Sequence, residues 1–225
     1  MSAVGDGIVF VVAAPSGTGK TTLCRRVVSE DPNVELAVSH TTREPRAGER
    51  EGVHYHFVTR QRFTDLVDAH AFLEWAAYNR NFYGTSWVSI EAPVAAGRDV
   101  LLEIEVQGAA QVSERLASAR LIFLLPPSLE ELERRLRDRG TDSDEEVRSR
   151  LMIARGEIGE VDAFHYAVVN DRVERAVAEL REVVEAEHTG NRGSVEARLS
   201  PRHLAPEFRQ MLGLPVPPQT KPGVC

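Results

Sequence analysis

Apolar and polar residues follow two alternating patterns along this chain. Largely apolar runs lie at residues 8–13, 100–106 and 121–125, with a shorter run at 167–169. Such runs predict strands that are buried on both faces of a sheet. Between them, apolar residues recur at helical spacing, at 22–29, 109–116, 129–137 and 174–187. Strands that alternate with helices predict an α/β fold, in which a parallel sheet carries helices on both faces.

Two segments break this alternation. The stretch 38–94 begins polar and rich in arginine and then alternates like a strand, so we expect an inserted, mostly β subdomain. Residues 138–150 contain Gly140, which suits a helix end, and then Ser143 followed by Glu146, which predicts a capping box. We therefore expect a helical flap, rich in arginine, at this second segment.

The C-terminal tail, residues 189–225, holds six of the twelve prolines of the chain. This composition predicts a tail that packs loosely or is disordered. With 225 residues and 42% hydrophobic residues, the rest suits one globular domain or a core with insertions.

Charge and cysteine content narrow the class of protein. The formal net charge of −7 argues against general nucleic-acid binding, so arginines that bind anions have to be gathered locally. Cys24 and Cys225 form no disulfide framework, and the N-terminus lacks the pattern of a secretory signal. No apolar run approaches the length that crosses a bilayer. We expect a cytoplasmic protein with neither a nucleic-acid nor a membrane partner.

The first apolar run leads directly into a glycine-rich segment, which we call the phosphate loop. Its residues are Ala14, Pro15, Ser16, Gly17, Thr18, Gly19, Lys20, Thr21 and Thr22. A strand, a glycine-rich turn, Lys-Thr and a helix in this order are typical of a loop whose backbone N–H groups cradle phosphates. Lys20 is placed to reach the terminal phosphates, and the Thr21 hydroxyl to ligate Mg²⁺. The usual pattern opens with Gly where this chain has Ala14, and a glycine-rich turn with a chance lysine is the alternative.

Further short motifs follow in a fixed order. They are Val38-Ser-His-Thr-Thr-Arg43-Glu-Pro-Arg46-Ala-Gly-Glu, Gly52-Val-His-Tyr55-His-Phe, Phe72-Leu-Glu74-Trp-Ala, Asn81-Phe-Tyr83-Gly-Thr85, Leu102-Glu103-Ile-Glu105-Val-Gln-Gly and Val169-Asn170-Asp171. Together with the phosphate loop, they make the chain resemble the guanylate kinases from about residue 8 to residue 188. The resemblance implies a P-loop nucleoside monophosphate kinase fold with an inserted GMP-binding subdomain and a helical lid.

The resemblance also implies an activity, a cofactor and a division of the chain. The activity is phosphorylation of GMP, and of dGMP, by ATP with Mg²⁺, a reaction of purine nucleotide metabolism. The expected parts are a core at 1–37, 95–130 and 161–188, a GMP-binding subdomain at 38–94, a lid at 131–160 and the tail at 189–225. The sequence leaves open whether the protein is a monomer or a homo-oligomer.

On the ATP side, the resemblance assigns the phosphate loop to the triphosphate and Asn170 to the neighbourhood of the adenine. A structural turn at Asn170-Asp171 is the alternative. Arg135, Arg139 and Arg150 are expected to close over the triphosphate from the lid, and with Lys20 and Arg43 they form the implied catalytic set. The nearby Arg134, Arg137 and Arg148 do not match the family pattern and are expected to be surface charge paired with acidic neighbours.

On the GMP side, Arg43 and Arg46 flank a proline, and Tyr55 follows. Guanidinium groups bind phosphate oxygens bidentately, and a phenol adds a neutral donor. By resemblance these three residues and Tyr83 hold the GMP phosphate, whereas a solvated basic loop is the alternative.

Guanine presents two adjacent donors, N1–H and the N2 amino group, which one carboxylate accepts together. Adenine offers no N1–H, so a buried carboxylate disfavours AMP. Glu74 is the matching carboxylate, and the hydroxyls of Ser39 and Thr85 could meet O6 and its neighbours. From the sequence alone, Glu74 could equally be an exposed helical residue.

Glu103 and Glu105 are two apart on one expected strand, so both are predicted to face the same side. The resemblance places Glu103 near Mg²⁺ through water and Glu105 on the guanine side, although the family usually has aspartates here. A pair of structural carboxylates is the alternative.

Two other functions remain open at this point. Guanylate-kinase-like domains also occur as inactive protein-binding modules, although Lys20, Thr21 and the arginines are all present here. A phosphotransferase for another nucleotide is the second alternative.

Overall fold

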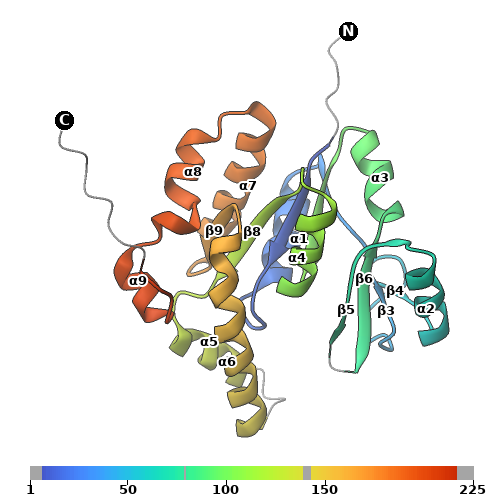
Figure 1. The fold of residues 1–225 in the computed structure, drawn as a ribbon, viewed down its shortest axis with the longest axis horizontal. Helices are drawn as coiled ribbons and strands as arrows, with labels where there is room; N and C mark the ends of the chain where they lie inside the picture. The colour runs from blue at the N-terminus through green and yellow to red at the C-terminus, as the bar shows by residue number, and fades with distance from the viewer. Residues whose placement is uncertain (1–6, 79, 139–142, 217–225) are drawn as a thin grey trace.

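The structure is a computed structural model that describes residues 7–78, 80–138 and 143–216. A five-stranded sheet with the order β2-β7-β1-β8-β9 forms its centre (Figure 1), and every pair of neighbouring strands in it is parallel. The strands are β1 (Val9–Ala13), β2 (Val34–Leu36), β7 (Asp99–Ile104), β8 (Arg120–Leu125) and β9 (Tyr166–Val169). The four predicted strands are therefore present, and the prediction missed only the short β2.

Helices cover both faces of this sheet, as the alternating pattern predicts. On β1, Phe10 and Val11 are both fully buried and belong to the two separate hydrophobic clusters, because successive residues of a strand point to opposite faces. One cluster includes residues of α1 (Lys20–Glu30) and α7 (Val173–Thr189), and the other includes residues of α3 (Val88–Ala95) and α4 (Val106–Arg115). The predicted α/β fold is confirmed.

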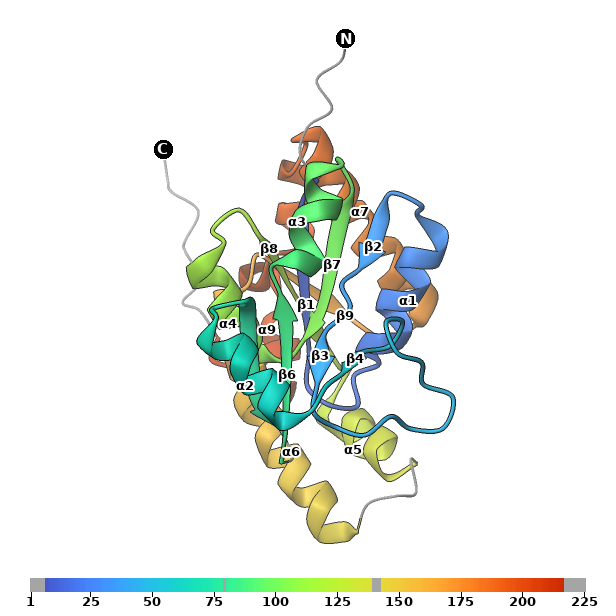
Figure 2. The same ribbon diagram turned by 90° about the vertical axis from the view of Figure 1, so that its right-hand side faces the viewer.

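A second sheet, with the order β4-β3-β6-β5, lies within the stretch 38–94. Its strands are β3 (His40–Thr41), β4 (His56–Phe57), β5 (Phe72–Tyr78) and β6 (Asn81–Ser86), and α2 (Arg60–Asp68) packs on it. Figure 2 views the molecule from the side of this smaller sheet. The Phe63 ring of α2 stacks on Phe72 and on Phe82, with ring centroids 4.6 and 5.4 Å apart. The inserted part thus has a small aromatic core of its own.

Two helices, α5 (Leu129–Arg137) and α6 (Asp144–Gly159), project from one end of the parallel sheet (Figure 1). They share a small hydrophobic cluster that includes Leu132 and Val147. The predicted capping box is present at the start of α6, where the Glu146 N–H donates to Ser143 Oγ and the Ser143 N–H donates to Glu146 Oε2. Gly140 lies outside the described residues.

The predicted loose or disordered tail is wrong for residues 189–216. They form α8 (Gly193–Leu199), the 3-10 helix η2 (Pro201–His203) and α9 (Pro206–Met211). Another 3-10 helix, η1 (Glu160–Ala163), follows α6 directly. Pro201 and Pro206 stand at helix starts, where the missing N–H of proline costs no hydrogen bond. The remaining residues, 217–225, lie outside the described part.

This C-terminal segment is held by apolar packing and by an ion pair between the buried Arg209 and the exposed Asp162. Leu212 and Leu214 belong to the same hydrophobic cluster as Val161 of η1. Arg209 is 1% exposed and donates to both carboxylate oxygens of Asp162, at 3.0 and 2.5 Å. None of the helices in the described residues is both long and apolar enough to cross a membrane.

Candidate active site

The phosphate loop connects β1 to α1 at the carboxyl end of the central strand. Gly17 and Gly19 adopt positive φ angles of 95° and 94°, which favour glycine. Ala14 is fully buried and does not have a positive φ. Among the described residues that are not glycine, only His70 and Arg80 have positive φ angles. The replacement of the usual first glycine by Ala14 therefore causes no backbone strain.

The turn of the loop is braced from two directions. The carbonyl of Thr18 accepts a hydrogen bond from Asn170 Nδ2 at 2.6 Å and another from Arg135 Nη1 at 3.4 Å. Arg135 also donates to the Asn170 carbonyl at 3.1 Å and to Glu131 at 2.8 Å. A Cβ atom on Gly19 would lie 2.7 Å from Asn170 Nδ2. Asn170, at the end of β9, and Arg135, on α5, thus both contact the loop directly.

Two residues at the start of α1 point to the end of β7. Lys20 Nζ donates to the Ile104 carbonyl at 2.5 Å and forms a 3.3 Å ion pair with Glu105. The Thr21 hydroxyl donates to Glu103 Oε1. A cavity surrounds these groups; most of the phosphate loop lines it, together with Tyr55, Glu103 and Glu105. We call this the loop cavity.

A second cavity lies between the two sheets, and we call it the acceptor cavity. Its lining includes the predicted residues Ser39, Arg43, Arg46, Tyr55, Glu74, Tyr83 and Glu105, as well as Glu103 and Gly108. Tyr55, Glu103 and Glu105 line both cavities, so the two adjoin. Burial raises the pKa of Tyr55 to about 12, which keeps its hydroxyl protonated as a donor.

The arginines on the loop between β3 and β4 are oriented by a neighbour that the sequence analysis missed. Glu49 accepts a hydrogen bond from Arg43 Nη2 at 2.9 Å and one from the Arg46 backbone N–H at 2.7 Å. The hydrogen bond from Arg43 lowers the pKa of Glu49. Glu49 entered the sequence analysis only as the last residue of a family motif and was given no role, because an acidic residue three positions after Arg46 is by itself too common to interpret.

Glu74 lies on β5 and is 4% exposed, so the alternative of an exposed helical residue is wrong. Its Oε1 atom accepts hydrogen bonds from the backbone N–H of Thr85 at 2.8 Å and from the Thr85 hydroxyl at 2.6 Å. The Thr85 oxygen is in turn 2.9 Å from the Ser39 hydroxyl, which is therefore the donor of that pair. Burial raises the pKa of Glu74, and the Thr85 hydrogen bonds oppose the rise.

The structure differs from the prediction in one detail of the Glu103 and Glu105 pair. β7 ends at Ile104, so Glu105 is not part of the strand but the N-cap residue of α4. Its backbone is still extended, at φ −82° and ψ 163°, and both carboxylates line both cavities. Burial raises the pKa of Glu103 against the opposing effect of its Thr21 hydrogen bond. A buried carboxylate beside a hydroxyl supplies the oxygen ligands that Mg²⁺ accepts, and Mg²⁺ commonly takes only one or two protein ligands beside phosphates.

Glu157 on α6 is a second residue that the sequence analysis missed. Burial, followed by the charge of Glu105, raises its pKa to about 7, while the charge of Lys20 opposes the rise. A single Glu among the polar residues of a helix carries no signal of such a position, because the proximity arises only in the fold.

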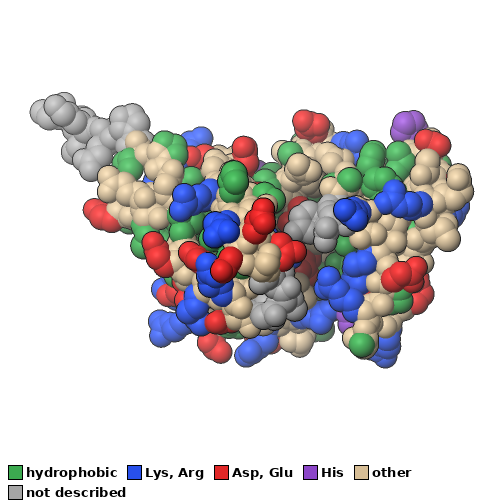
Figure 3. All heavy atoms as spheres, turned by 90° about the horizontal axis from the view of Figure 1, so that it is seen from below, with side chains coloured by type: hydrophobic (Ala, Val, Ile, Leu, Met, Phe, Trp, Pro, Cys, Tyr) green, Lys and Arg blue, Asp and Glu red, His purple; other side chains and the backbone are tan. Residues whose placement is uncertain are grey.

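The predicted lid arginines have different outcomes. Arg135 contacts the phosphate loop, as described above, and Arg139 lies outside the described residues. Arg150 lies on α6, where its charge contributes to lowering the pKa of Glu146. Arg134 and Arg137 form ion pairs with acidic neighbours, and Arg148 is exposed, as expected for surface charge. Figure 3 shows Lys and Arg side chains on both halves of the face seen from below, with Asp and Glu among them.

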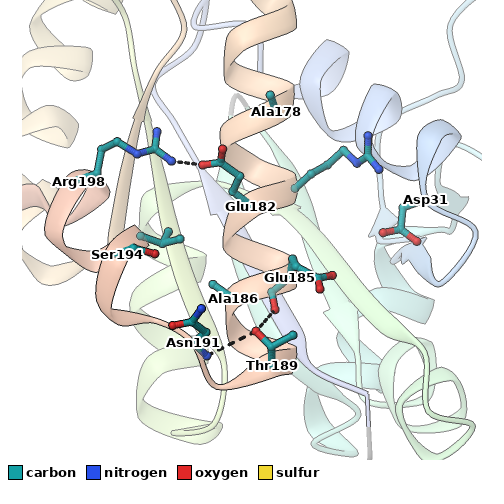
Figure 4. A pocket seen from close by; sticks show the side chains of 11 residues that line it. Asp31, Ala178, Glu182, Glu185, Ala186, Thr189, Asn191, Ser194 and Arg198 are labelled. Carbon is teal, nitrogen blue, oxygen red and sulfur yellow. Dashed lines mark hydrogen bonds and ion pairs between the residues drawn. The ribbon is translucent and has the colours of Figure 1, made fainter.

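Another hollow lies between α7 and α8, with Asp31 at the end of α1 on its rim (Figure 4). Its lining contains none of the residues predicted to bind nucleotides. Arg198 forms an ion pair with Glu182, and Arg181 forms one with Glu30 at 3.5 Å. The lining of this hollow has three carboxylates against two arginines and no glycine-rich loop, so it is a poorer site for a phosphate than the two adjoining cavities.

Comparisons with known proteins place most of the chain in one group. The family model described as guanylate kinase matches residues 7–187. The guanylate kinase of Neisseria meningitidis serogroup A is 50% identical over 186 residues, 83% of this chain and 91% of that protein. That of Aromatoleum aromaticum is 51% identical over 180 residues, 80% of this chain and 88% of that protein. A crystal structure of guanylate kinase from Anaplasma phagocytophilum matches with a TM-score of 0.68 at 31% identity, covering 86% of this chain and 96% of that one.

Proposed function

Because this chain belongs to the guanylate kinase family, we propose that its two adjoining cavities bind ATP and GMP and that it transfers the γ-phosphoryl group between them. The products are ADP and GDP, and dGMP is the expected second acceptor. The observation that carries the proposal is the shared lining of the two cavities by Tyr55, Glu103 and Glu105. A shared wall is what direct transfer between two bound nucleotides requires, since donor and acceptor oxygens have to lie in line.

In this proposal the loop cavity holds the phosphates of ATP. Backbone N–H groups of the phosphate loop, which only Pro15 lacks, and the positive end of α1 face the phosphate oxygens. Lys20 leaves its ion pair with Glu105 and binds the β- and γ-phosphates. Arg135, Arg139 and Arg150 stabilise the charge that develops on the transferred group, and closure of α5 and α6 excludes water. Asn170 braces the loop and lies on the adenine side.

The acceptor cavity holds GMP. Arg43, Arg46, Tyr55 and Tyr83 bind its phosphate, and the Glu49 carboxylate keeps Arg43 in place before GMP arrives. The Glu74 carboxylate accepts hydrogen bonds from guanine N1–H and the N2 amino group, with Glu105 on the same side. Ser39 and Thr85 complete the guanine site, since the Thr85 hydroxyl fixes the carboxylate of Glu74 and the Ser39 hydroxyl, which lines the cavity, donates to Thr85 and can turn to O6 when GMP binds.

The family generally uses a divalent metal, and we propose Mg²⁺ held by the Thr21 hydroxyl and, through water, by Glu103. When bound, Mg²⁺ neutralises phosphate charge and orients the β- and γ-phosphates. The GMP phosphate oxygen forms the new bond to the γ-phosphorus as the bond to the ADP oxygen breaks. No strong base is needed, because the phosphate of GMP is already ionised. The division into core, subdomain and lid, and the cytoplasmic location, remain predictions.

The test is product analysis with the purified full-length protein. Incubation with MgATP and GMP is expected to give ADP and GDP in equal amounts, with ADP absent when GMP is left out. Excess EDTA is expected to stop both products. ADP without GDP would show a hydrolase, and neither product from folded protein that still binds GMP would favour the inactive binding module.

A further inference from the structure

One face of α4 lies along β5 and contacts it at three successive turns. Gly108, Gln111 and Arg115 are spaced by three and then four residues, so they lie on the same side of the helix. The end of this helix that bears Glu105 adjoins Lys20, and β5 bears Glu74. Here α4, which covers the parallel sheet, packs against β5 of the smaller sheet, the strand that carries the proposed guanine-binding carboxylate.

Side chains of α4 hold the backbone of β5 on either side of Glu74. Gln111 Nε2 donates to the Trp75 carbonyl at 2.8 Å, and the Trp75 N–H donates back to Gln111 Oε1 at 3.3 Å. Arg115 Nη1 donates to the carbonyls of Leu73 and Phe72, at 2.8 and 3.3 Å. The residues immediately before and after Glu74 are therefore both fixed to α4.

Gly108 lies beside the carboxylate of Glu74, with too little room between them for a side chain. A Cβ atom built on Gly108 would lie 2.7 Å from Glu74 Oε2 and 3.3 Å from Glu74 Cδ. Both distances are shorter than an ordinary contact, which is about 3.5–4.0 Å between carbon atoms. The other oxygen, Oε1, is held by the N–H and hydroxyl of Thr85. The carboxylate is thus confined between Thr85 on one side and the bare backbone of α4 on the other.

An irregularity in the sheet turns Glu74 toward this position. The pairing of β5 with β6 shifts between Phe72 and Glu74, the mark of a β-bulge. Leu73 is fully buried in the hydrophobic cluster of the parallel sheet, and Glu74 is also buried, although neighbouring residues of a regular strand face opposite sides. Bulges commonly re-aim a side chain next to an active site.

We propose that Gly108 and Gln111 are positioning residues that set the place of the Glu74 carboxylate and thereby the affinity and selectivity for the guanine base. This inference rests on the proposed function and adds to it the residues that aim its specificity-determining group. Gln111 does not line the acceptor cavity, and Gly108, which does, acts in this proposal through Glu74. Gly108 is required because any larger side chain pushes the carboxylate away from its Thr85 donors or pushes β5 away from α4.

The central test compares Gly108→Ala with wild-type protein in steady-state kinetics with GMP and ATP. The KM for GMP is expected to rise about tenfold, the loss expected when a buried hydrogen bond is broken. The KM for ATP is expected to change less than twofold. The matched control is Gly193→Ala on α8, where the structure places no heavy atom within 4 Å of the added Cβ and both constants should stay unchanged.

A second substitution separates positioning from general damage. Glu74→Asp in the Gly108→Ala background shortens the displaced side chain by one bond, so it is expected to recover part of the GMP affinity, whereas Glu74→Asp alone should weaken it. If Gly108→Ala fails to fold, Gln111→Met removes the two hydrogen bonds to Trp75 at nearly constant volume and should raise the KM for GMP about threefold.

The results that would overturn the positioning role differ from the result that would overturn the proposed function. An unchanged KM for GMP in folded Gly108→Ala and Gln111→Met proteins, an equal rise of the two KM values, or no recovery in the double variant overturns the positioning role. Failure of the wild-type protein to phosphorylate GMP overturns the proposed function instead.

Discussion

The two cavities are built in opposite ways. The loop cavity is formed largely by the backbone of one continuous segment, residues 14–22, between a buried strand and the helix that follows it. The acceptor cavity is formed by side chains from several separate parts of the chain, from Ser39 to Gly108. The first is therefore determined by local glycine positions, and the second by how two sheets and a helix pack together.

This difference predicts different sensitivities to substitution. A backbone cradle is expected to tolerate a changed side chain where φ is negative, and Ala14 is such a position because it does not have a positive φ. A side-chain site has no such tolerance, because each group is aimed by its neighbours, as Glu74 is by Thr85 and Arg43 is by Glu49. Lys20 and Thr21 are exceptions in the loop cavity, since in our account the Lys20 ammonium group contacts the phosphates and the Thr21 hydroxyl holds Mg²⁺.

The largest effect is expected from Lys20→Ala. Removal of this positive charge from the transferring phosphoryl group should lower kcat by about 10³-fold or more, the range seen for a cation that stabilises such a transition state. GMP binding, measured by calorimetry, should stay within about threefold because the acceptor cavity is left intact. Nearly full turnover from a folded Lys20→Ala protein would break the comparison at its strongest point.

Glu74→Gln should produce the next largest effect, and in the other cavity. The amide offers one acceptor and one donor group where guanine presents two donors, so the ratio of kcat/KM for GMP to that for AMP should fall about 10- to 100-fold. The KM for ATP should not change. An unaltered ratio would remove Glu74 from guanine recognition while leaving the phosphate chemistry in place.

Glu157→Gln tests a residue whose charge interacts with Glu105 and Lys20, and it should change how the melting temperature depends on pH. The folded-state pKa of Glu157 is raised by burial to about 7, from an ordinary value of about 4.5, so the folded protein binds this proton more tightly than the unfolded chain. The contribution of Glu157 to stability is therefore present at low pH and is lost as the pH rises to about 7. The glutamine variant should melt about 2–4 °C above the wild-type protein at pH 8, and the two should coincide near pH 4. Coincident melting curves at both pH values contradict the assignment.

The smallest effect on catalysis is expected from Ala14→Gly. The substitution restores the usual loop residue, but Ala14 has negative φ and is fully buried, so kcat should stay within about twofold. The free energy of unfolding should fall by about 0.5–1 kcal/mol, because glycine loses more backbone entropy on folding than alanine does. A large gain in kcat would show that the loop is not tolerant at this position.

The same contrast separates what the sequence predicts from what it does not. Gly17, Gly19, Lys20 and Thr21 are adjacent in the chain, so their arrangement follows from local backbone rules. Glu157 and Glu49 gain their importance from contacts that the fold creates, and no spacing marks them. The acceptor residues were predicted only because several motifs together resemble a known family.

The tail shows why composition can mislead. Its prolines suggested disorder, yet two of the six, Pro201 and Pro206, stand at helix starts, where proline is well tolerated. The ion pair of Arg209 with Asp162 joins residues 47 apart in the sequence, and Leu212 and Leu214 pack in the same cluster as Val161, which is still farther from them along the chain. Such distant contacts leave no local signal in the sequence.

The most direct test of the account is the rate of ADP formation from MgATP with GMP, dGMP, AMP, CMP, UMP and dTMP as separate acceptors. The account predicts turnover with GMP and dGMP alone, because only guanine presents N1–H and an amino group side by side to the Glu74 carboxylate. Comparable turnover with AMP or a pyrimidine nucleotide would contradict it, since phosphate transfer would then proceed without recognition of the guanine base.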